Sequence, residues 1–503
     1  MSFDVSTPTG LLQALGPDLV LIVGAMVLML VAAFRPESAG HQRRVGLMAL
    51  GVLVATIATM SWYATNASST TVHGIIAVDG FRWAVNLVFL VGAAATIALG
   101  IEANPRDRIV AAESHVLVLF ATAGMMVLAA ARDLMIVFLG VEMMSIAVYV
   151  LAGINRSSAR SAEGALKYFL LGAFSTGFLL YGIALIYGAT GSTHLGVIGE
   201  RIGTFGLAGH GMLLVGVGLL LVGFAFKIAA VPFHMWAPDV YEGAPTPITA
   251  YMAAAVKAAA FAMFLRAWLE AFSLLDGSWL TPIWWLAAVT MVAGNAIALA
   301  QRNVKRMLAY SSIVHGGYLL VAVAAGTGLG SAAFLFYGIA YTLATFGAFA
   351  IVSVMAPTGS RGALIRDYEG LWTTRPWLAV GFAICMLALL GFPIFGGVGF
   401  FAKWYVLQAA ITSPRELTPL AIVLVLTSVV SAGYYLHVVR VMFMKPRPED
   451  ADEPGPVYPL TQAVLVGSVA LILLLGLFPN TLATWAKDNA LGARPTAVTT
   501  NAP

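Results

Sequence analysis

Four lysines lie inside apolar stretches of this sequence, where a charged side chain is costly. They are Lys167, Lys227, Lys257 and Lys403. Lys257 lies in APTPITAYMAAAVKAAAFAMFLRAW, ten residues after Pro247, which puts it about 15 Å along a helix and near the middle of a bilayer. A charge at that depth must face a polar interior. Because amines bind and release protons, the four lysines are candidates for a proton path.

Three further titratable residues accompany the lysines. Glu142 is an acid that stands clearly within an apolar run, and it is the natural counter-charge for Lys257. A buried Lys–Glu pair has two states of similar energy that a nearby proton can shift, and the alternative is a static pair that joins two helices. His234 and His315 are candidates for a relay. A core histidine bonded to a hydroxyl is the other interpretation of His315.

Two of the lysines stand beside helix-breaking sequence. Lys227 is followed by AAVPFHMW, and Lys403 follows GFPIFGGVG. Irregular backbone at membrane depth is tolerated only where it lines protein or water, so both breaks indicate a polar pocket. Snorkelling to the interface is the alternative for Lys227. For Lys167 the alternative is an interfacial i,i+4 pair with Glu163.

Composition places the chain in the membrane. Of the 503 residues, 60% are hydrophobic and 10% are charged, against about 25% charged in soluble domains. Long apolar runs recur from end to end and predict an all-α polytopic membrane protein rather than a β-barrel. A single cysteine, Cys385, excludes iron–sulfur ligation within this chain. The scattered basic residues do not indicate nucleic-acid binding.

We predict fourteen membrane spans, of which the seventh and twelfth are irregular. Their approximate limits are 17–34, 45–63, 80–101, 113–130, 134–153, 164–188, 209–231, 246–270, 282–300, 307–324, 330–355, 376–411, 418–439 and 460–482. Most Lys and Arg residues, Lys305 among them, fall in loops that follow odd-numbered spans, which predicts both termini on the outer side. Arg82, at the start of the third span, is expected to snorkel.

A faint internal repeat joins spans four to eight with spans nine to thirteen. Tyr149 and Tyr318 are 169 residues apart, as are Tyr168 and Tyr337, and Lys227 and Lys403 are 176 apart. Five spans per copy would invert the second copy relative to the first, as in many transporters. The buried charges, the breaks and the repeat together predict proton or cation translocation.

The stretch FKIAAVPFHMWAPDVYEGAPTP (226–247) closely resembles the antiporter-like subunits of respiratory complex I, the proton-pumping NADH–quinone oxidoreductase. The resemblance continues through AVKAAAF, NVKRMLAYSSIVHGGY and GFPIFGGVGFFAKW and fits nearly the whole chain, although the terminal spans match mainly in hydropathy. It implies fourteen helices in two inverted five-helix repeats, with helices seven and twelve broken.

The resemblance also assigns six residues to the proton path by position. They are Glu142 on helix five, its partner Lys227 on helix seven, the central Lys257 on helix eight, Lys403 on helix twelve, and the flanking relay residues Lys167 and His315 on helices six and ten. Of the family's three subunit types, one usually has glutamate in place of Lys403, and another continues into a long lateral helix. The subunit N type remains.

The implied organisation has four parts: helices one to three (1–112), the first repeat (113–275), the second repeat (276–445), and the last helix with its tail (446–503). No cofactor is implied on this chain, and FMN, iron–sulfur clusters and quinone are expected on other subunits. The implied partners are the antiporter-like subunit M, the small membrane subunits next to the quinone site, the lateral helix of the long subunit, and lipids. The implied location is the bacterial inner membrane.

Two alternatives share these features. A multi-subunit sodium/proton antiporter has the same helices and buried lysines, and a hydrogenase-linked membrane complex differs in its redox partner. A non-pumping scaffold would leave the four intramembrane lysines and the two breaks unexplained.

Overall fold

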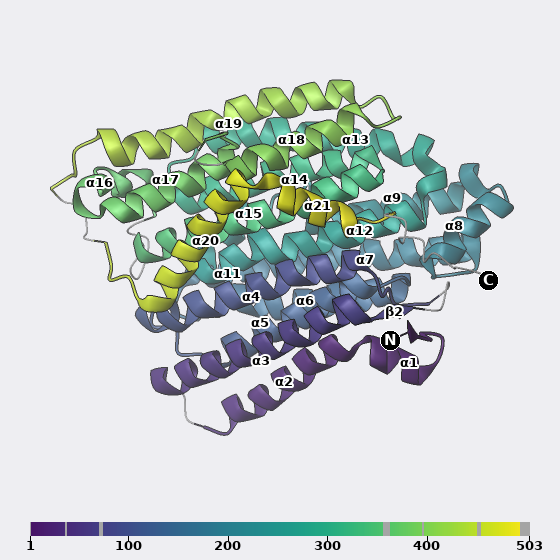
Figure 1. Ribbon diagram of the computed structural model, residues 1–503, viewed down its shortest axis with the longest axis horizontal. Helices are drawn as coiled ribbons and strands as arrows, with labels where there is room; N and C mark the ends of the chain where they lie inside the picture. Colours follow the sequence, from purple (N-terminus) through teal and green to yellow (C-terminus); the bar gives the residue numbers. More distant parts are fainter. Residues whose placement is uncertain are drawn as a thin grey trace, which may run out of the picture.

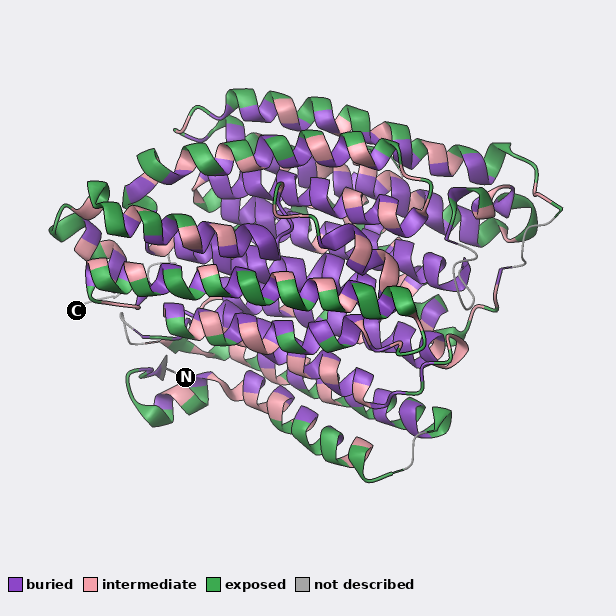
Figure 2. Ribbon diagram, turned by 180° about the vertical axis from the view of Figure 1, so that it is seen from behind, coloured by how far each residue is buried: buried purple, intermediate pink, exposed green. Residues whose placement is uncertain are grey.

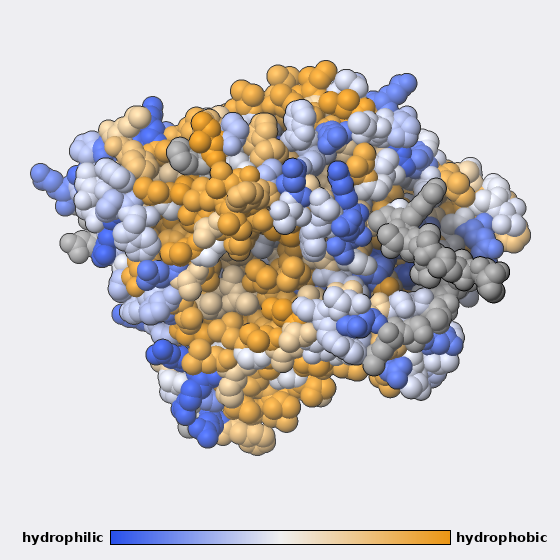
Figure 3. All heavy atoms as spheres, in the orientation of Figure 1, coloured by the Kyte–Doolittle hydropathy of each residue, from blue (hydrophilic) through white to orange (hydrophobic). Residues whose placement is uncertain are grey.

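The computed structural model describes residues 2–35, 38–69, 74–355, 363–394, 397–449 and 454–492. Within these ranges the chain is almost entirely helical (Figure 1), and one short parallel pair joins β1 (Ser2–Phe3) to β2 (Ser68–Ser69). A hydrophobic belt lies between two hydrophilic ends (Figure 3). Twelve helices in the described ranges are long and apolar enough to cross a membrane. The prediction of an all-α polytopic membrane protein is therefore confirmed.

The helices of the first half follow the order of the predicted spans. They are α1 (Pro8–Ala14), α2 (Gly16–Ala33), α3 (Ala39–Asn66), α4 (Gly80–Arg106), α5 (Glu113–Ala130), α6 (Leu134–Ala152), α7 (Ala159–Thr190), α8 (Leu195–Thr204), η1 (Leu207–Gly209), α9 (Gly211–Lys227), α10 (Ala237–Gly243), α11 (Thr246–Tyr251), η2 (Met252–Val256) and α12 (Lys257–Glu270).

The second half continues the same pattern after a short connection. Its helices are η3 (Ser273–Leu275), α13 (Asp276–Leu299), α14 (Val304–Ala325), α15 (Gly328–Met355), η4 (Ile365–Tyr368), α16 (Leu371–Thr374), α17 (Pro376–Leu390), α18 (Gly397–Ile411), α19 (Thr418–Met444), α20 (Pro459–Leu477) and α21 (Pro479–Asp488).

The centre of the bundle is formed by α11–α12, α14 and α15. In the most apolar stretch of α11–α12 and of α14 every residue is buried, whereas most residues in the corresponding stretches of α2, α19 and α20 are at least partly exposed. Figure 2 shows this difference as a buried interior surrounded by helices with one exposed face. A side chain that points inward from α12 or α14 is therefore shielded on all sides, and both helices carry predicted site residues.

The first predicted break follows Lys227, where α9 ends. The chain then runs irregularly until α10, and its backbone groups find side-chain partners. The indole Nε1 of Trp236 donates to the Phe226 carbonyl at 3.1 Å, and the Val231 N–H donates to Thr290 Oγ1 at 2.9 Å. Because these groups are satisfied within the protein, the break is stable at membrane depth.

The second break separates α17 from α18. Helix α17 ends at Leu390, and Gly391 follows in the left-handed conformation, with φ of 81°. Residues 395–396 of the predicted break lie outside the described residues. At the start of α18, a Cβ on Gly399 would lie 1.8 Å from the Ala388 carbonyl oxygen. Only glycine allows this close approach of the two half-helices.

The bundle has two ends. The end that we call the termini end carries α1, the start of α4 and the segment after α21, since Gly80 lies against Asn489. The other end, which we call the cavity end, carries α10 and the start of α14.

Arg82 does not snorkel. It lies near the termini end with no exposed surface, and it donates to Asp18 at 2.5 Å. The expectation was wrong because the partner of Arg82 comes from α2, 64 residues earlier.

Candidate functional site

Lys257 occupies the middle of the bundle, as its sequence position predicted. It is 3% exposed, and its Nζ donates to the carbonyl oxygen and to the Oγ of Ser312 on α14, at 2.6 and 2.5 Å. The turns immediately before it, Met252–Val256, form a π-helix. Such widened turns are rare and frequently mark functional sites.

Lys227 ends α9 and is also buried, at 4% exposure. Its Nζ donates to Ser145 Oγ at 2.8 Å and to the Tyr149 hydroxyl at 3.1 Å, both on α6. Glu142 lies one turn earlier on α6, half-buried, and its Oε1 has no hydrogen-bond partner among the described residues. The structure describes both Lys227 and Glu142, and no ion pair within 4 Å joins them.

The direct pair expected between Glu142 and Lys227 is therefore absent from this conformation. The two residues are near enough to interact electrostatically, but Ser145 takes the position next to the amine. A carboxylate on the neighbouring turn of the same helix face can replace that hydroxyl by a side-chain rotation alone, since residues three or four apart lie on one face.

His315 lies at the centre of a group of hydroxyls that we call the His315 cluster, formed by His315, Ser311, Tyr337 and Tyr435. The two ring nitrogens of His315 contact the hydroxyls of Tyr337 and Tyr435 at 2.5 and 3.1 Å, and Tyr435 also contacts Ser311. Ser311 is adjacent to Ser312, the partner of Lys257. Hydroxyls both donate and accept, so this cluster can carry a proton in either direction.

Lys403 lies beyond the His315 cluster. Its Nζ donates to the Leu390 carbonyl, which the second break leaves free, at 2.8 Å. A small cavity of about 10 Å³ is lined by both His315 and Lys403. That volume is near the minimum that one water molecule requires.

Each break has its lysine near the ring of a tyrosine. Lys227 lies near the ring of Tyr149, 5.5 Å from its centroid, and Lys403 lies 4.8 Å from the ring centroid of Tyr318. These are the two tyrosines that the sequence spaces 169 residues apart. Among the described residues, no carboxylate lies within 4 Å of Lys227, Lys257 or Lys403.

His234 is not brought to the other candidates. It is half-buried in the irregular segment after α9, and its Nδ1 has no hydrogen-bond partner among the described residues.

Lys167 lies at the cavity end and is 42% exposed. It forms the interfacial i,i+4 ion pair with Glu163, at 2.7 Å, that was the alternative interpretation of this lysine. It also pairs with Asp239 at 2.8 Å. It contacts none of the buried lysines in the described part of the chain.

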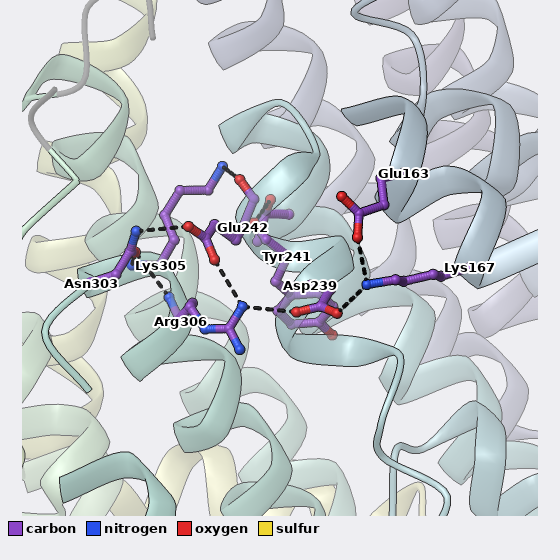
Figure 4. A network of polar contacts seen from close by, with 9 residues as sticks. Glu163, Lys167, Asp239, Tyr241, Glu242, Asn303, Lys305 and Arg306 are labelled. Carbon is purple, nitrogen blue, oxygen red and sulfur yellow. Dashed lines mark hydrogen bonds and ion pairs between the residues drawn. The ribbon is translucent and has the colours of Figure 1, made fainter. Parts of the chain in front are cut away.

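The ion pairs of Lys167 continue into a network across the cavity end (Figure 4). Asp239 on α10 pairs with Arg306 on α14 at 2.8 Å, and Arg306 pairs with Glu242 at 2.9 Å. Burial raises the pKa of the Asp239 carboxyl, but hydrogen bonds and ion pairs with Lys167 and Arg306 outweigh it and hold that pKa below its usual range. The network thus ties α7 to α14 through α10, the short helix after the first break.

We expect Asp239→Asn to lower the free energy of unfolding at neutral pH by about 1 kcal/mol, since the ion pairs are partly exposed. The folded-state pKa of Asp239 lies below the unfolded value of about 3.9, so the contribution is complete above that pH and is lost as the pH falls through the folded value. Thermal unfolding of both proteins in detergent between pH 8 and pH 3 measures this. Glu200→Gln, an exposed carboxylate on α8, is the control. A wild-type advantage that stays constant down to pH 3 would contradict the assignment.

Sequence reasoning missed Lys305. It was placed in a loop, yet it lies in the first turn of α14, 7% exposed. The sequence did contain a signal that Lys305 faces the interior. It lies seven residues before Ser312, and that spacing puts both side chains on one face of a helix. Arg266 is also buried, 1% exposed on α12, and it pairs with Asp79 at 2.8 Å.

Comparison with known proteins decides the family. Residues 131–436 match the model described as NADH:quinone oxidoreductase/Mrp antiporter, TM. NADH-quinone oxidoreductase subunit N of Gemmatimonas aurantiaca is 48% identical, over 98% of this chain and 96% of the relative. The chain belongs to the NADH-quinone oxidoreductase subunit N family. Subunit N of Trichlorobacter lovleyi is 43% identical, over 95% of this chain and 96% of the relative.

Solved structures of membrane complexes contain chains of similar fold. A chain of respiratory complex I from Thermus thermophilus with bound aureothin superposes with a TM-score of 0.78 at 36% identity, covering 93% of this chain and 98% of that one. A chain of the Mrp complex from Dietzia sp. DQ12-45-1b superposes with a TM-score of 0.81 at 21% identity, over 96% and 98%. The latter likeness shows the fold alone.

Proposed function

We propose that this chain is the proton-translocating subunit N of a NADH–quinone oxidoreductase, and that it moves protons through its buried lysines while electron transfer takes place on other subunits. One observation carries the proposal: Lys227, Lys257 and Lys403 are buried at the breaks and the centre of the bundle, and none has a carboxylate partner among the residues that the structure describes. Burial disfavours the charged form of an isolated amine, so each lysine is ready to exchange a proton.

The proposed path follows the contacts along α14. Approach of Glu142 to Lys227 compensates the charge of the Lys227 ammonium, and its withdrawal leaves that positive charge unpaired, which drives the proton of Lys257 onward. From Lys257 the proton passes through Ser312 to the His315 cluster and on to Lys403 on α18, the half-helix that follows the second break. Alternating approach and withdrawal of one carboxylate thus gives the path a direction. Lys167 acts at its margin through the ion pairs with Asp239, and His234 lines the first break.

We propose that the redox cofactors and the neighbouring membrane subunits belong to other chains of the complex. We place FMN, the iron–sulfur clusters and quinone on other subunits. The proposed neighbours of this chain are subunit M, the small membrane subunits and the lateral helix of the long subunit. Lipids cover the rest of its hydrophobic surface. The half-buried Glu142 lies between exposed Leu139 and Ile146 on α6, and a charge there needs a protein neighbour rather than lipid. We place the complex in a bacterial inner membrane with the termini end outward, since most basic loops lie at the cavity end.

We also propose that α9 with α10, and α17 with α18, each count as one broken crossing, which gives fourteen crossings with both termini on one side. The equivalent contacts of Lys227 with Tyr149 and of Lys403 with Tyr318 support two inverted repeats, 113–275 and 276–445. Residues 1–112 and 446–503 then flank the repeats.

Purification of the tagged chain in mild detergent tests the proposed function. We expect the isolate to contain further subunits and to reduce quinone with NADH. A stable assembly without that activity and without iron–sulfur absorbance would contradict it and would favour an ion-gradient antiporter or a hydrogenase-linked complex.

We expect Tyr435→Phe to slow NADH-driven proton pumping by about tenfold or more, because it removes the hydroxyl that joins His315 to Ser311 while leaving the ring in place. Tyr368→Phe is the control, since Tyr368 is also buried and its hydroxyl has no hydrogen-bond partner among the described residues. Proton uptake by membrane vesicles after NADH addition measures both variants. Equal pumping by the two variants would remove Tyr435 from the path.

A further inference from the structure

The cavity end contains a polar cavity of about 540 Å³ that the proton path described above does not use. It lies between the end of α4, the loop before α7, the segment joining α10 to α11, and the start of α14. Exposed Arg108, Ser157 and Arg160 line it. Its lining also includes the buried Lys305 and the half-buried Glu242. The cavity therefore connects accessible side chains with a buried amine.

The amine of Lys305 is held by backbone oxygens rather than by acids. Its Nζ donates to the carbonyls of Ala244 and Glu242 at 2.7 and 3.1 Å. In the described part of the chain, no carboxylate lies within 4 Å of it. The Glu242 carboxylate is occupied by Arg306 at 2.9 Å and Asn303 at 3.3 Å. A neutral amine has two N–H groups and one lone pair, so with both N–H groups donated to the carbonyls its lone pair is left to take a proton from the cavity.

Helix α14 leads from this amine to the centre of the bundle. Ser312 lies seven residues after Lys305, on the same helix face and about 10 Å further along the axis. Ser312 is the residue to which Lys257 donates. Tyr241, whose neighbour Glu242 holds Lys305, also places its hydroxyl near Ser312. A hydroxyl thus lies on the way from the cavity to the central lysine.

We propose that this cavity is the proton entrance of the chain and that Lys305 is the first group to take up a proton from it, passing it by way of Tyr241 and Ser312 to Lys257. This inference rests on the proposed function. It makes the cavity a site for water or hydronium rather than for a lipid or a nucleotide. The surrounding network of Asp239, Glu242 and Arg306 fixes the carbonyls that hold the amine.

Two substitutions of Lys305 separate proton transfer from anchoring. Lys305→Arg keeps the positive charge and the donors toward the Ala244 carbonyl, but arginine does not release its proton. Lys305→Met removes both functions. We expect both to lower NADH-driven proton pumping at least about tenfold at equal amounts of assembled complex. Pumping that survives in Lys305→Arg but not in Lys305→Met would overturn the proposal, because Lys305 would then only hold the backbone.

A chemical block tests the cavity without altering Lys305. Ser157→Cys introduces a thiol on the cavity wall, and the single native cysteine, Cys385, is buried. We expect a thiol-reactive trimethylammonium reagent to lower pumping at least about tenfold in Ser157→Cys vesicles, since the fixed cation repels protons and fills the entrance. The parent and Ala39→Cys, an exposed position on α3, serve as controls. Complete modification of Ser157→Cys with unchanged pumping would overturn the proposal.

The two proposals fail differently. If the chain does not pump through its buried lysines, Lys257→Ala retains pumping. If only the entrance is wrong, Lys257→Ala stops pumping whereas Lys305→Arg and modified Ser157→Cys do not.

Discussion

Replacing Lys257 with alanine stops proton pumping through this chain while the complex still assembles. The amine is the central link between the lysine of the first break and the hydroxyls around His315, and alanine offers nothing to carry the proton. We expect NADH-driven pumping to fall by about 100-fold, within the range for removal of a positioned proton carrier. Acidification of inverted membrane vesicles on NADH addition measures the effect, with the amount of assembled complex determined on a native gel.

Two further variants isolate the chemistry from the packing. Lys257→Met keeps an unbranched side chain of similar size but cannot titrate, and it should fail like alanine. Met263→Ala removes a fully buried side chain from the same helix and should pump normally, although it leaves a cavity that lowers stability by about 2–5 kcal/mol. A Lys257→Ala complex that assembles, oxidises NADH and pumps with unchanged stoichiometry would remove Lys257 from the path.

Arg82→Met is expected to prevent stable folding rather than to impair transport. The guanidinium is fully buried and donates to Asp18 and to the carbonyls of Ala14 and Ala77, at 2.5, 3.2 and 2.9 Å. Removing it leaves the Asp18 carboxylate buried without its partner, which costs about 3–5 kcal/mol. Protein levels in the membrane and the midpoint of thermal unfolding in detergent measure the loss.

The double variant Arg82→Met/Asp18→Asn tests the reason for that loss. It should be more stable than Arg82→Met alone, because asparagine leaves no uncompensated charge behind. Arg43→Met, an exposed arginine on α3, should leave stability unchanged. If the double variant is no better than the single one, the packing of the arginine stem, and not the ion pair, holds α2 against α4.

Hydropathy was sufficient to predict the all-α membrane architecture and the buried positions of Lys227, Lys257 and Lys403. Apolar runs of about 20 residues dictate membrane helices, and a lysine such as Lys257 is conspicuous because nothing around it is charged. The spacing of Tyr149 and Tyr318 also carried information, since both tyrosines lie against the lysine of a break. These features are local, or repeat at a fixed distance along the chain.

The partners of the charged groups could not be predicted in the same way. Arg82 finds Asp18 across 64 residues, and Lys227 finds Ser145 across 82. Such contacts depend on how helices pack, which local sequence does not determine. Lys305 was missed for a different reason: it lies next to the loop before α14, and only the tertiary structure covers the first turn of that helix.

The most direct test of the central claim is the gradient that the isolated complex generates. We would purify the complex through a tag on this chain, reconstitute it in liposomes without sodium, and follow internal pH after adding NADH and quinone. A proton gradient that forms without sodium and disappears with Lys257→Ala is the predicted result. A gradient that requires sodium, or no NADH-dependent gradient in an intact complex, would contradict a redox-driven proton pump.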